Sequence, residues 1–312
     1  MSVDRERNMA ASVRARLLAK AKTENLAFNQ VLQRYAMERV LYRLSVSDYA
    51  ASFYLKGALL FLVWDLPERR STMDIDLLGF MENSMEQVES VFRSICSQNV
   101  PDDGLVIELD TLRAQRIKQD ADYEGVRLTF RARLDTAVIS IQVDVGFGDQ
   151  IGSRSTQLDF PVLLDMPIPR LWCYSAETVI AEKFEAMVKL ELLNSRMKDF
   201  YDIWLLSRQN SFEMGALQRA CKATFERRQT ECKVDNPLFG AEMRDSPAKQ
   251  QQWMAFRKKS KLSACPESFG LLLDELFVFL LPIGRNLESE AVSSETWEPG
   301  GPWKFGDDGR EF

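Results

Sequence analysis

The chain has 312 residues, of which 46% are hydrophobic and 28% charged, a composition typical of a globular protein with one large or two modest domains. It contains no histidine, which excludes His-based triads, His metal ligands and imidazole acid–base chemistry. Its five cysteines are scattered and include no C-x-x-C pair, which argues against a zinc site or disulfide framework. No signal-like apolar run follows Met1 and charges interrupt every long hydrophobic stretch, so we expect a cytosolic protein without a membrane span.

The net charge of −6 does not point to nucleic acid, but the charge is unevenly distributed. Residues 1–43 carry nine Lys and Arg against four Asp and Glu, and residues 219–261 carry eleven against five. Residues 288–312 carry two against seven. The basic segments are interpreted either as a split footprint for a polyanion or as solvated faces of amphipathic helices.

The first half of the chain predicts helices followed by a sheet. Apolar residues recur at helical spacing over 4–22 and 26–45, and a turn at Gly57 opens into a short buried helix. Alternation predicts strands over 73–80, 106–112, 126–134 and 139–147, with a helix over 84–98. Asp135 and Thr136 form the turn of a hairpin between the last two strands.

The second half is mostly helical. Ser175 is a plausible N-cap for a helix to about Leu193, and further helices are expected over 198–206, 212–228, 247–260 and 267–281. Prolines at 161, 167 and 169 separate the two parts, so we expect an α+β domain with a mixed sheet over 1–165 and a helical domain over 166–312. A tail from about residue 286 is expected to be extended and to dock through Trp297, Trp303 and Phe305.

Three strand carboxylates carry the main functional signal. Asp74 and Asp76 lie on one face of their strand, about 7 Å apart at Cα. Asp144 lies on the polar face of an otherwise apolar strand, where an unpaired charge is costly to bury. If the three carboxylates meet, their repulsion calls for a cation, and we expect Asp74, Asp76 and Asp144 to bind Mg²⁺, with Mn²⁺ as an alternative.

Residues near this strand are candidates for contacting an NTP. The turn Lys56-Gly57-Ala58 can admit phosphates close to the backbone because Gly57 and Ala58 are small. Arg70 can clamp phosphate oxygens, and Thr72 can donate to one. Arg69 is interpreted as a surface arginine that closes a loop.

A second cluster lies in the helical half. Lys183 has apolar neighbours along its helix and can reach a triphosphate as a compact positive charge. Asp199 and Asp202 share one helix face, and either can orient Lys183 or accept a proton from an attacking hydroxyl. Ordinary ion pairs that link two helices explain the same spacing equally well.

Five blocks in order resemble the AbiEii family of nucleotidyltransferase toxins over about residues 30–210. They are Tyr35 to Ser45, Leu55-Lys56-Gly57-Ala58, Arg70-x-Thr72-x-Asp74-x-Asp76-Leu77, Ser175-x-Glu177-x-x-x-Ala181-Glu182-Lys183, and Lys198-Asp199-Phe200-Tyr201-Asp202-Ile203. The resemblance implies a DNA polymerase β-like nucleotidyltransferase fold and a Mg²⁺-dependent toxin of a type IV toxin–antitoxin or phage-defence (abortive infection) system. It also implies metal binding by Asp74 and Asp76, nucleotide contacts by Gly57, Ala58 and Lys183, and completion of the site by Asp199 or Asp202.

Relatives of this kind add nucleotides to the 3′ acceptor end of tRNA, so the resemblance implies an EC 2.7.7-type enzyme with an NTP, an RNA acceptor and a cognate antitoxin as partners. The family usually has Gly-Gly or Gly-Ser where this chain has Gly57-Ala58, so a phosphate-binding hydroxyl is missing. Two alternatives stay open: transfer to a small molecule or protein side chain, or a nucleotide-binding regulator that acts through a partner.

Overall fold

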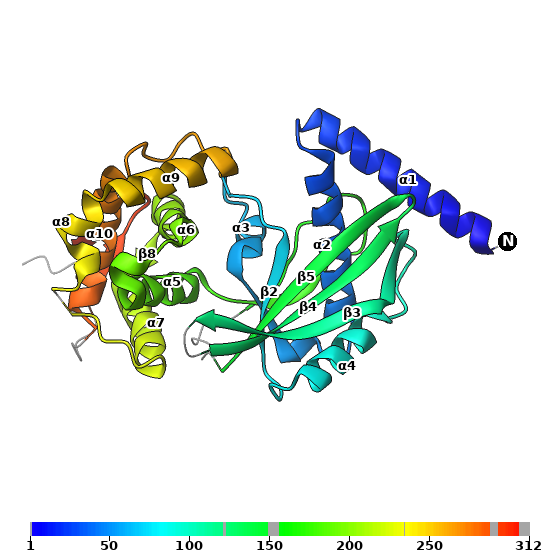
Figure 1. Cartoon of the computed structure of the whole chain (residues 1–312), viewed down its shortest axis with the longest axis horizontal. Coiled ribbons are helices and arrows are strands. Elements are labelled where there is room, and N and C mark those ends of the chain that lie inside the picture. The colour runs from blue at the N-terminus through cyan, green and yellow to red at the C-terminus, as the bar shows by residue number, and fades with distance from the viewer. Residues whose placement is uncertain (1, 121–122, 149–155, 234, 288–292, 306–312) are drawn as a thin grey trace, which may run out of the picture. The chain divides into compact units, whose positions relative to one another are not determined.

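The computed structural model describes residues 2–120, 123–148, 156–233, 235–287 and 293–305. The chain forms two compact units, which Figure 1 shows as a sheet with its helices and a group of helices. Unit 1 contains residues 1–65, 71–149 and 155–174, and unit 2 contains residues 66–70, 150–154 and 175–312. The main division therefore falls after Tyr174, nine residues beyond the predicted boundary, because the strands just before it belong to the sheet of unit 1.

Unit 1 is built on a seven-stranded mixed sheet with the order β3-β4-β5-β2-β1-β7-β6. The strand β2 pairs in parallel with β5 and antiparallel with β1, and β1 pairs in parallel with β7. The bounds are β1 Phe53–Lys56, β2 Asp74–Gly79, β3 Leu105–Asp120, β4 Tyr123–Leu134, β5 Ala137–Phe147, β6 Thr156–Asp159 and β7 Arg170–Cys173. The predicted hairpin at residues 135–136 is confirmed, since Leu134 pairs with Ala137.

Alternation in β4 and β5 separates a buried face of the sheet from an exposed one. Most apolar side chains of both strands are buried, whereas Thr129, Arg131, Arg133 and Ser140 are exposed on the other face. The helices of unit 1 are α1 Ser2–Thr23, α2 Phe28–Ser45, α3 Leu60–Val63 and α4 Met85–Cys96. Of these, α2 contacts β5 and β7, and α4 contacts β3 and β4. One face of the sheet is therefore packed on helices, and the other is polar.

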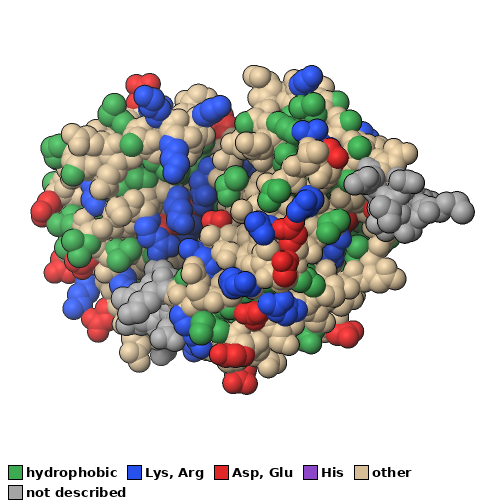
Figure 2. All heavy atoms as spheres, turned by 45° about the vertical axis from the view of Figure 1, so that its right-hand side comes forward, with side chains coloured by type: hydrophobic (Ala, Val, Ile, Leu, Met, Phe, Trp, Pro, Cys, Tyr) green, Lys and Arg blue, Asp and Glu red, His purple; other side chains and the backbone are tan. Residues whose placement is uncertain are grey.

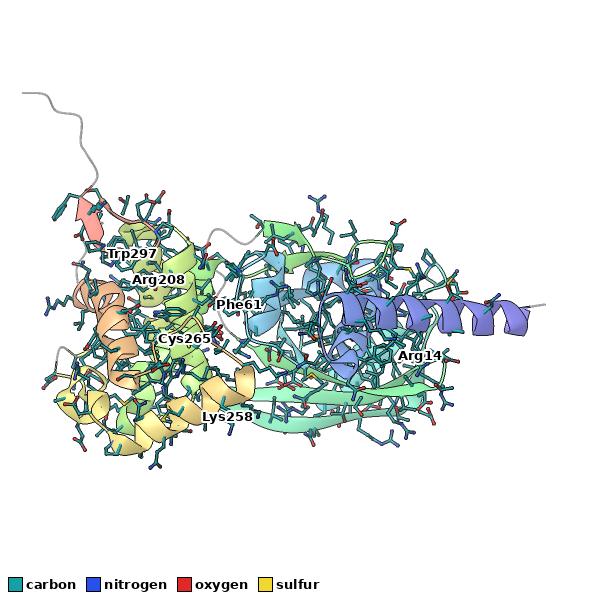
Figure 3. All side chains as sticks on the ribbon, turned by 90° about the horizontal axis from the view of Figure 1, so that it is seen from above. Arg14, Phe61, Arg208, Lys258, Cys265 and Trp297 are labelled. Carbon is teal, nitrogen blue, oxygen red and sulfur yellow. The ribbon has the colours of Figure 1, made fainter. Side chains whose placement is uncertain are left out.

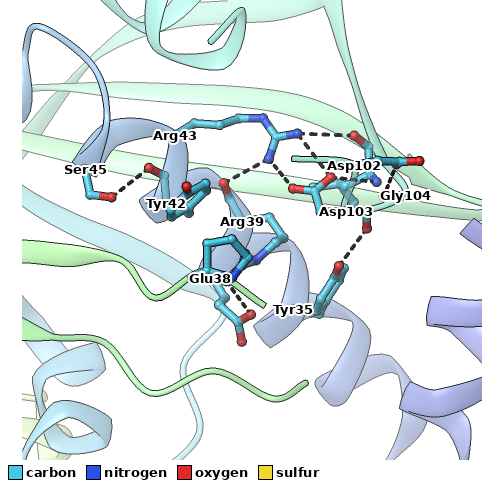
Figure 4. A network of polar contacts seen from close by, with 11 residues as sticks. Tyr35, Glu38, Arg39, Tyr42, Arg43, Ser45, Asp102, Asp103 and Gly104 are labelled. Carbon is cyan, nitrogen blue, oxygen red and sulfur yellow. Dashed lines mark hydrogen bonds and ion pairs between the residues drawn. The ribbon is translucent and has the colours of Figure 1, made fainter. Parts of the chain in front are cut away.

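Buried charges attach α2 to the rest of unit 1 (Figure 4). Arg43 Nη1 and Nη2 donate to the two carboxylate oxygens of Asp103 at 2.7 and 3.2 Å, and Tyr35 Oη donates to the Asp103 carbonyl at 2.7 Å. Glu38 accepts from a backbone N–H at 2.8 Å and lies 2.7 Å from Arg39. Burial raises the pKa of Glu38 despite that arginine. The block from Tyr35 to Ser45 thus has a structural role in this unit.

Unit 2 is mainly helical. Its helices are α5 Ala176–Leu190, α6 Met197–Gln209, α7 Met214–Arg227, α8 Ala241–Arg244, α9 Pro247–Ser260 and α10 Phe269–Arg285. Ser175 caps α5 as predicted, because its Oγ accepts from the backbone N–H of Thr178. The described helices include none with the length and apolarity that a bilayer span requires.

The end of the chain joins a small sheet in unit 2, with the order β10-β9-β8 (β8 Phe212–Glu213, β9 Glu295–Trp297, β10 Trp303–Phe305). Trp297, which Figure 3 labels, is buried. Its Nε1 donates to the carbonyl of Ser207 at 2.7 Å. The ring of Trp303 stacks on Phe279 with 5.6 Å between centroids. Phe305 is 81% exposed, so its predicted docking is wrong, and parts of the predicted tail (288–292 and 306–312) lie outside the described residues.

Candidate functional site

Strand register brings the three aspartates onto neighbouring strands of unit 1. Asp76 of β2 is the register partner of Asp144 of β5, and Asp74 is the partner of Gln142. Asp74 and Asp76 are half-buried, and Asp144 is 8% exposed. Adjacent strands lie about 4.8 Å apart, so the backbone places Asp76 and Asp144 side by side.

The charge of Asp144 is compensated by a residue that the sequence analysis did not single out. Arg127 of β4 donates to both carboxylate oxygens of Asp144, at 2.8 and 2.7 Å. The hydrogen bond to Asp144 raises the pKa of Arg127, and Asp74 and Asp76 raise it further by their charge. In this structure a bidentate arginine, and not a cation, offsets the cost of burying the charge of Asp144.

The residues fit a hard cation in donor type and strand register but only partly in side-chain orientation. Carboxylate oxygens are the ligands that Mg²⁺ prefers. Among the residues that the structure describes, however, no three acidic or cysteine side chains converge into a ready metal cluster. In this structure Asp144 is held by Arg127, so it would have to release that arginine before it could bind a cation.

The turn after β1 lies directly against the aspartates. Lys56 pairs in register with Asp76, and Gly57 has a φ of +71°. A Cβ on Gly57 would lie 2.8 Å from Cβ and Cγ of Asp76 and would overlap its Oδ2. Only glycine therefore fits this position. Lys56 and Ala58 are buried, and the ammonium of Lys56 lies 5.6 Å from the ring centroid of Tyr174.

The second predicted cluster is assembled inside unit 2. Lys183 of α5 donates to Asp199 at 2.7 Å and lies 2.9 Å from Asp202, both on α6. Arg196 forms an ion pair with the other oxygen of Asp199, with 2.8 Å between Nε and Oδ2. Burial acts to raise the pKa of Asp199, but the charges of Lys183 and Arg196 outweigh it, so the pKa is lowered. Both aspartates thus orient Lys183.

Arg70 belongs to the same cluster. Its guanidinium donates to both oxygens of Asp202, each at 2.9 Å. Burial acts to raise the pKa of Asp202, but Arg70 and Lys183 lower it. Asp202 is thus fully buried and contacts two cationic side chains. Arg69 donates to a backbone carbonyl three residues earlier, as expected of a loop-closing arginine, and Thr72 is half-buried before β2.

The pairing of Arg127 with Asp144 was accessible from the sequence. The hairpin pairs Leu134 with Ala137, so a residue seven positions before Leu134 faces the residue seven positions after Ala137. These two residues are Arg127 and Asp144. The contact of Arg70 with Asp202, by contrast, joins residues 132 positions apart and left no local signal.

Comparisons with known proteins extend these observations. The chain is similar to two solved Helicobacter pylori structures: JHP933, with 15% identity over 85% of this chain and 96% of that chain, and a protein provisionally described as a nucleotidyltransferase, with 16% identity over 85% and 99%. Both have a TM-score of 0.44, a level at which the likeness supports no assignment. No curated protein sequence matches.

A family model does match, and it covers most of the chain. The match runs over residues 39–275, about three quarters of the sequence, and includes the strand aspartates of unit 1 and the lysine–aspartate cluster of unit 2. The family is described as nucleotidyl transferase AbiEii toxin, type IV TA system, and the resemblance seen in the five sequence blocks is confirmed. The chain belongs to the AbiEii family of nucleotidyltransferase toxins.

Proposed function

We propose that this chain transfers a nucleoside monophosphate from an NTP to an RNA acceptor, the 3′ end of tRNA. The observation that carries the proposal is the register of β2 and β5, which sets Asp76 beside Asp144 with Asp74 on the same strand. The glycine turn that packs against Asp76 adds a place where phosphates can approach the backbone. Membership of the nucleotidyltransferase family supports the reaction class.

The chain's own residues hold and orient the NTP in this proposal. The turn at Gly57 and Ala58 lies along the triphosphate, and Lys56 and Thr72 flank it. The family resemblance assigns Lys183 of unit 2 to the nucleotide as a point charge, and within unit 2 Asp199 and Asp202 hold its ammonium in place. Arg70, held by both oxygens of Asp202, adds a planar donor for phosphate oxygens.

Asp74 and Asp76 would hold Mg²⁺, and Asp144 would join them after releasing Arg127. The chemistry that a bound Mg²⁺ supplies is neutralisation of phosphate charge and activation of the attacking oxygen. Mn²⁺ has the same preference for oxygen ligands and is expected to substitute.

The biological role proposed is that of a toxin controlled by a cognate antitoxin, in a type IV toxin–antitoxin or phage-defence system. Support comes from the family description. Nucleotides added to a tRNA acceptor end block its aminoacylation, so growth arrest is the expected result of unrestrained activity. The proposal places this chemistry in the cytoplasm, where NTPs and tRNA are found.

Incubation with each α-labelled NTP, Mg²⁺ and total tRNA tests the proposal. The wild type and Asp135→Asn, a control in an exposed turn whose φ of 53° suits asparagine, should label RNA and release pyrophosphate. Asp76→Asn should lose at least about 100-fold in rate, because a metal ligand is lost. Failure of the wild type to label RNA with any NTP would contradict the proposal.

Expression in cells separates catalysis from a purely regulatory role. If nucleotide transfer causes toxicity, the wild type and Asp135→Asn should arrest growth, and Asp76→Asn should not. Equal toxicity of all three would favour a nucleotide-binding regulator that acts through a partner.

A further inference from the structure

The exposed face of β3, β4 and β5 carries a groove that ends at the candidate metal ligands. Its volume is about 720 Å³, and its lining includes Asp74, Arg113, Thr129, Arg131, Ser140 and Gln142. All of these residues belong to unit 1. Basic side chains also gather on the face that Figure 2 shows, although acidic residues are in excess in the chain as a whole. From this groove, and resting on the proposed function, we propose a subsite for the acceptor.

A straight row of paired residues forms the floor of the groove. Asp74 pairs with Gln142, Gln142 pairs with Thr129, and Thr129 pairs with Arg113. Three steps between neighbouring strands span about 14 Å. At roughly 3.4 Å per stacked nucleotide, that length holds about four nucleotides. The groove therefore has the dimensions of a short single strand that ends at Asp74.

The two sides of the aspartates differ, and this gives the acceptor a direction. The glycine turn adjoins Asp76 on the β1 side of β2, whereas the groove lies on the β5 side. In phosphoryl transfer, the attacking and leaving oxygens lie roughly in line through phosphorus. If the turn at Gly57 holds the leaving pyrophosphate, the attacking hydroxyl arrives from the opposite side, which is the groove.

The chemistry of the lining favours a polynucleotide. Arg113 and Arg131 are exposed cations, and Thr129, Ser140 and Gln142 are neutral hydrogen-bonding groups. Besides Asp74, the lining has one acidic residue, Asp110. A small acceptor bound at Asp74 would not reach Arg113, about 14 Å away across the strands. The groove thus binds the last nucleotides of an acceptor strand, with phosphates at Arg113 and Arg131.

A side chain of α2 that itself lines the groove fixes the backbone at the end of this floor. Gln33 of α2 donates from Nε2 to the carbonyls of Met73 and Ser140, at 3.0 and 2.9 Å. These bonds join the chain entering β2 to β5 at the end of the row. The groove is therefore a preformed surface, and binding a strand there needs little reordering.

A comparison of arginines on the same face tests the proposal. Arg131 and Arg133 both pair with Glu108, each with a contact of 3.1 Å, but only Arg131 lines the groove. Steady-state transfer to the RNA acceptor is measured for a double variant that carries both Arg113→Ala and Arg131→Ala. The single variant Arg133→Ala is the matched control. The double variant should raise the acceptor KM at least about 10-fold, leave the NTP KM unchanged, and reduce the salt slope of RNA binding by about 1.4 for two lost phosphate contacts.

A second variant acts on the floor without removing an arginine. Thr129→Asp adds an exposed anion at the centre of the row and should weaken acceptor binding at least as much. The acceptor subsite is refuted if the double variant and Thr129→Asp both have the acceptor KM and salt slope of the Arg133→Ala control. In that case, transfer to RNA by the wild type would still support the proposed function. Transfer only to a small molecule or protein would overturn both.

Discussion

Replacement of Gly57 by alanine tests whether the turn and Asp76 work as one unit. The new methyl group would lie 2.8 Å from two carbons of Asp76, at least 0.6 Å short of the ordinary 3.4 Å contact. A positive φ costs an alanine about 1–2 kcal/mol, and forcing Asp76 off its rotamer costs about 0.5–1.5 kcal/mol. The free energy of unfolding should therefore fall by about 1.5–3.5 kcal/mol.

The activity loss should be larger than the stability loss explains. A displacement of more than half an ångström in a catalytic carboxylate is enough to lower the rate about 10–100-fold. Gly104→Ala is a matched control, because Gly104 has a φ of +69° and its Cβ would lie 2.8 Å from Cα of Ala10, away from the aspartates. Denaturant unfolding and transfer of labelled NMP at a temperature where each variant is folded separate the two effects.

The control decides the outcome. Gly104→Ala should lose similar stability but keep its rate per folded molecule. Equal rates for Gly57→Ala and Gly104→Ala would refute the reasoning, as would a Gly57→Ala variant as stable as the wild type. Either result would mean that the turn does not constrain Asp76.

Three further predictions concern buried charges. Arg43→Met leaves the Asp103 carboxylate buried without its partner and should lower the free energy of unfolding by about 3–5 kcal/mol in thermal or urea melts. The pKa of Asp202 is lower in the folded state than in the unfolded state, so its carboxylate stabilises the fold at pH values above its unfolded pKa of about 3.9. This stabilisation is lost as the pH falls through the folded pKa, so the free energy of unfolding of Asp202→Asn should depend less on pH in this acid range. An unchanged pH dependence would contradict the assignment. Arg127→Met frees Asp144 and should tighten Mn²⁺ binding measured by calorimetry without nucleotide, whereas weaker binding would show that Arg127 does not compete with the cation.

Much of the secondary structure was predictable because it rests on local periodicity. The hairpin of β4 and β5, the helices predicted over 26–45 and 84–98, and the cap at Ser175 are all confirmed. The predicted helix over 212–228 begins only at Met214, because Phe212 pairs with Trp297 in the small sheet. The strand β7 was missed because its partner β1 lies far away in the sequence, as the pairing of Trp172 with Tyr54 shows. The strand β6, which pairs with β7, was missed with it.

Candidate site residues divide in the same way. Alternation alone put Asp74 and Asp76 on one strand face, and hairpin register was sufficient to pair Arg127 with Asp144. The ion pair between Arg70 and Asp202 could not be predicted in this way, because Arg70 comes from a loop far from Asp202 in the sequence.

The sequence by itself determined which residues share a strand or helix face, since side-chain direction follows from a repeat of two or 3.6 residues. It also determined the family, because five short blocks keep their order along the chain. Only the tertiary structure decided that Asp76 faces Asp144 across a parallel pair, that Gly57 packs against Asp76, and that a groove opens beside them. Parallel strands are joined by long crossovers, so their register is fixed by packing of the whole sheet and leaves no local pattern.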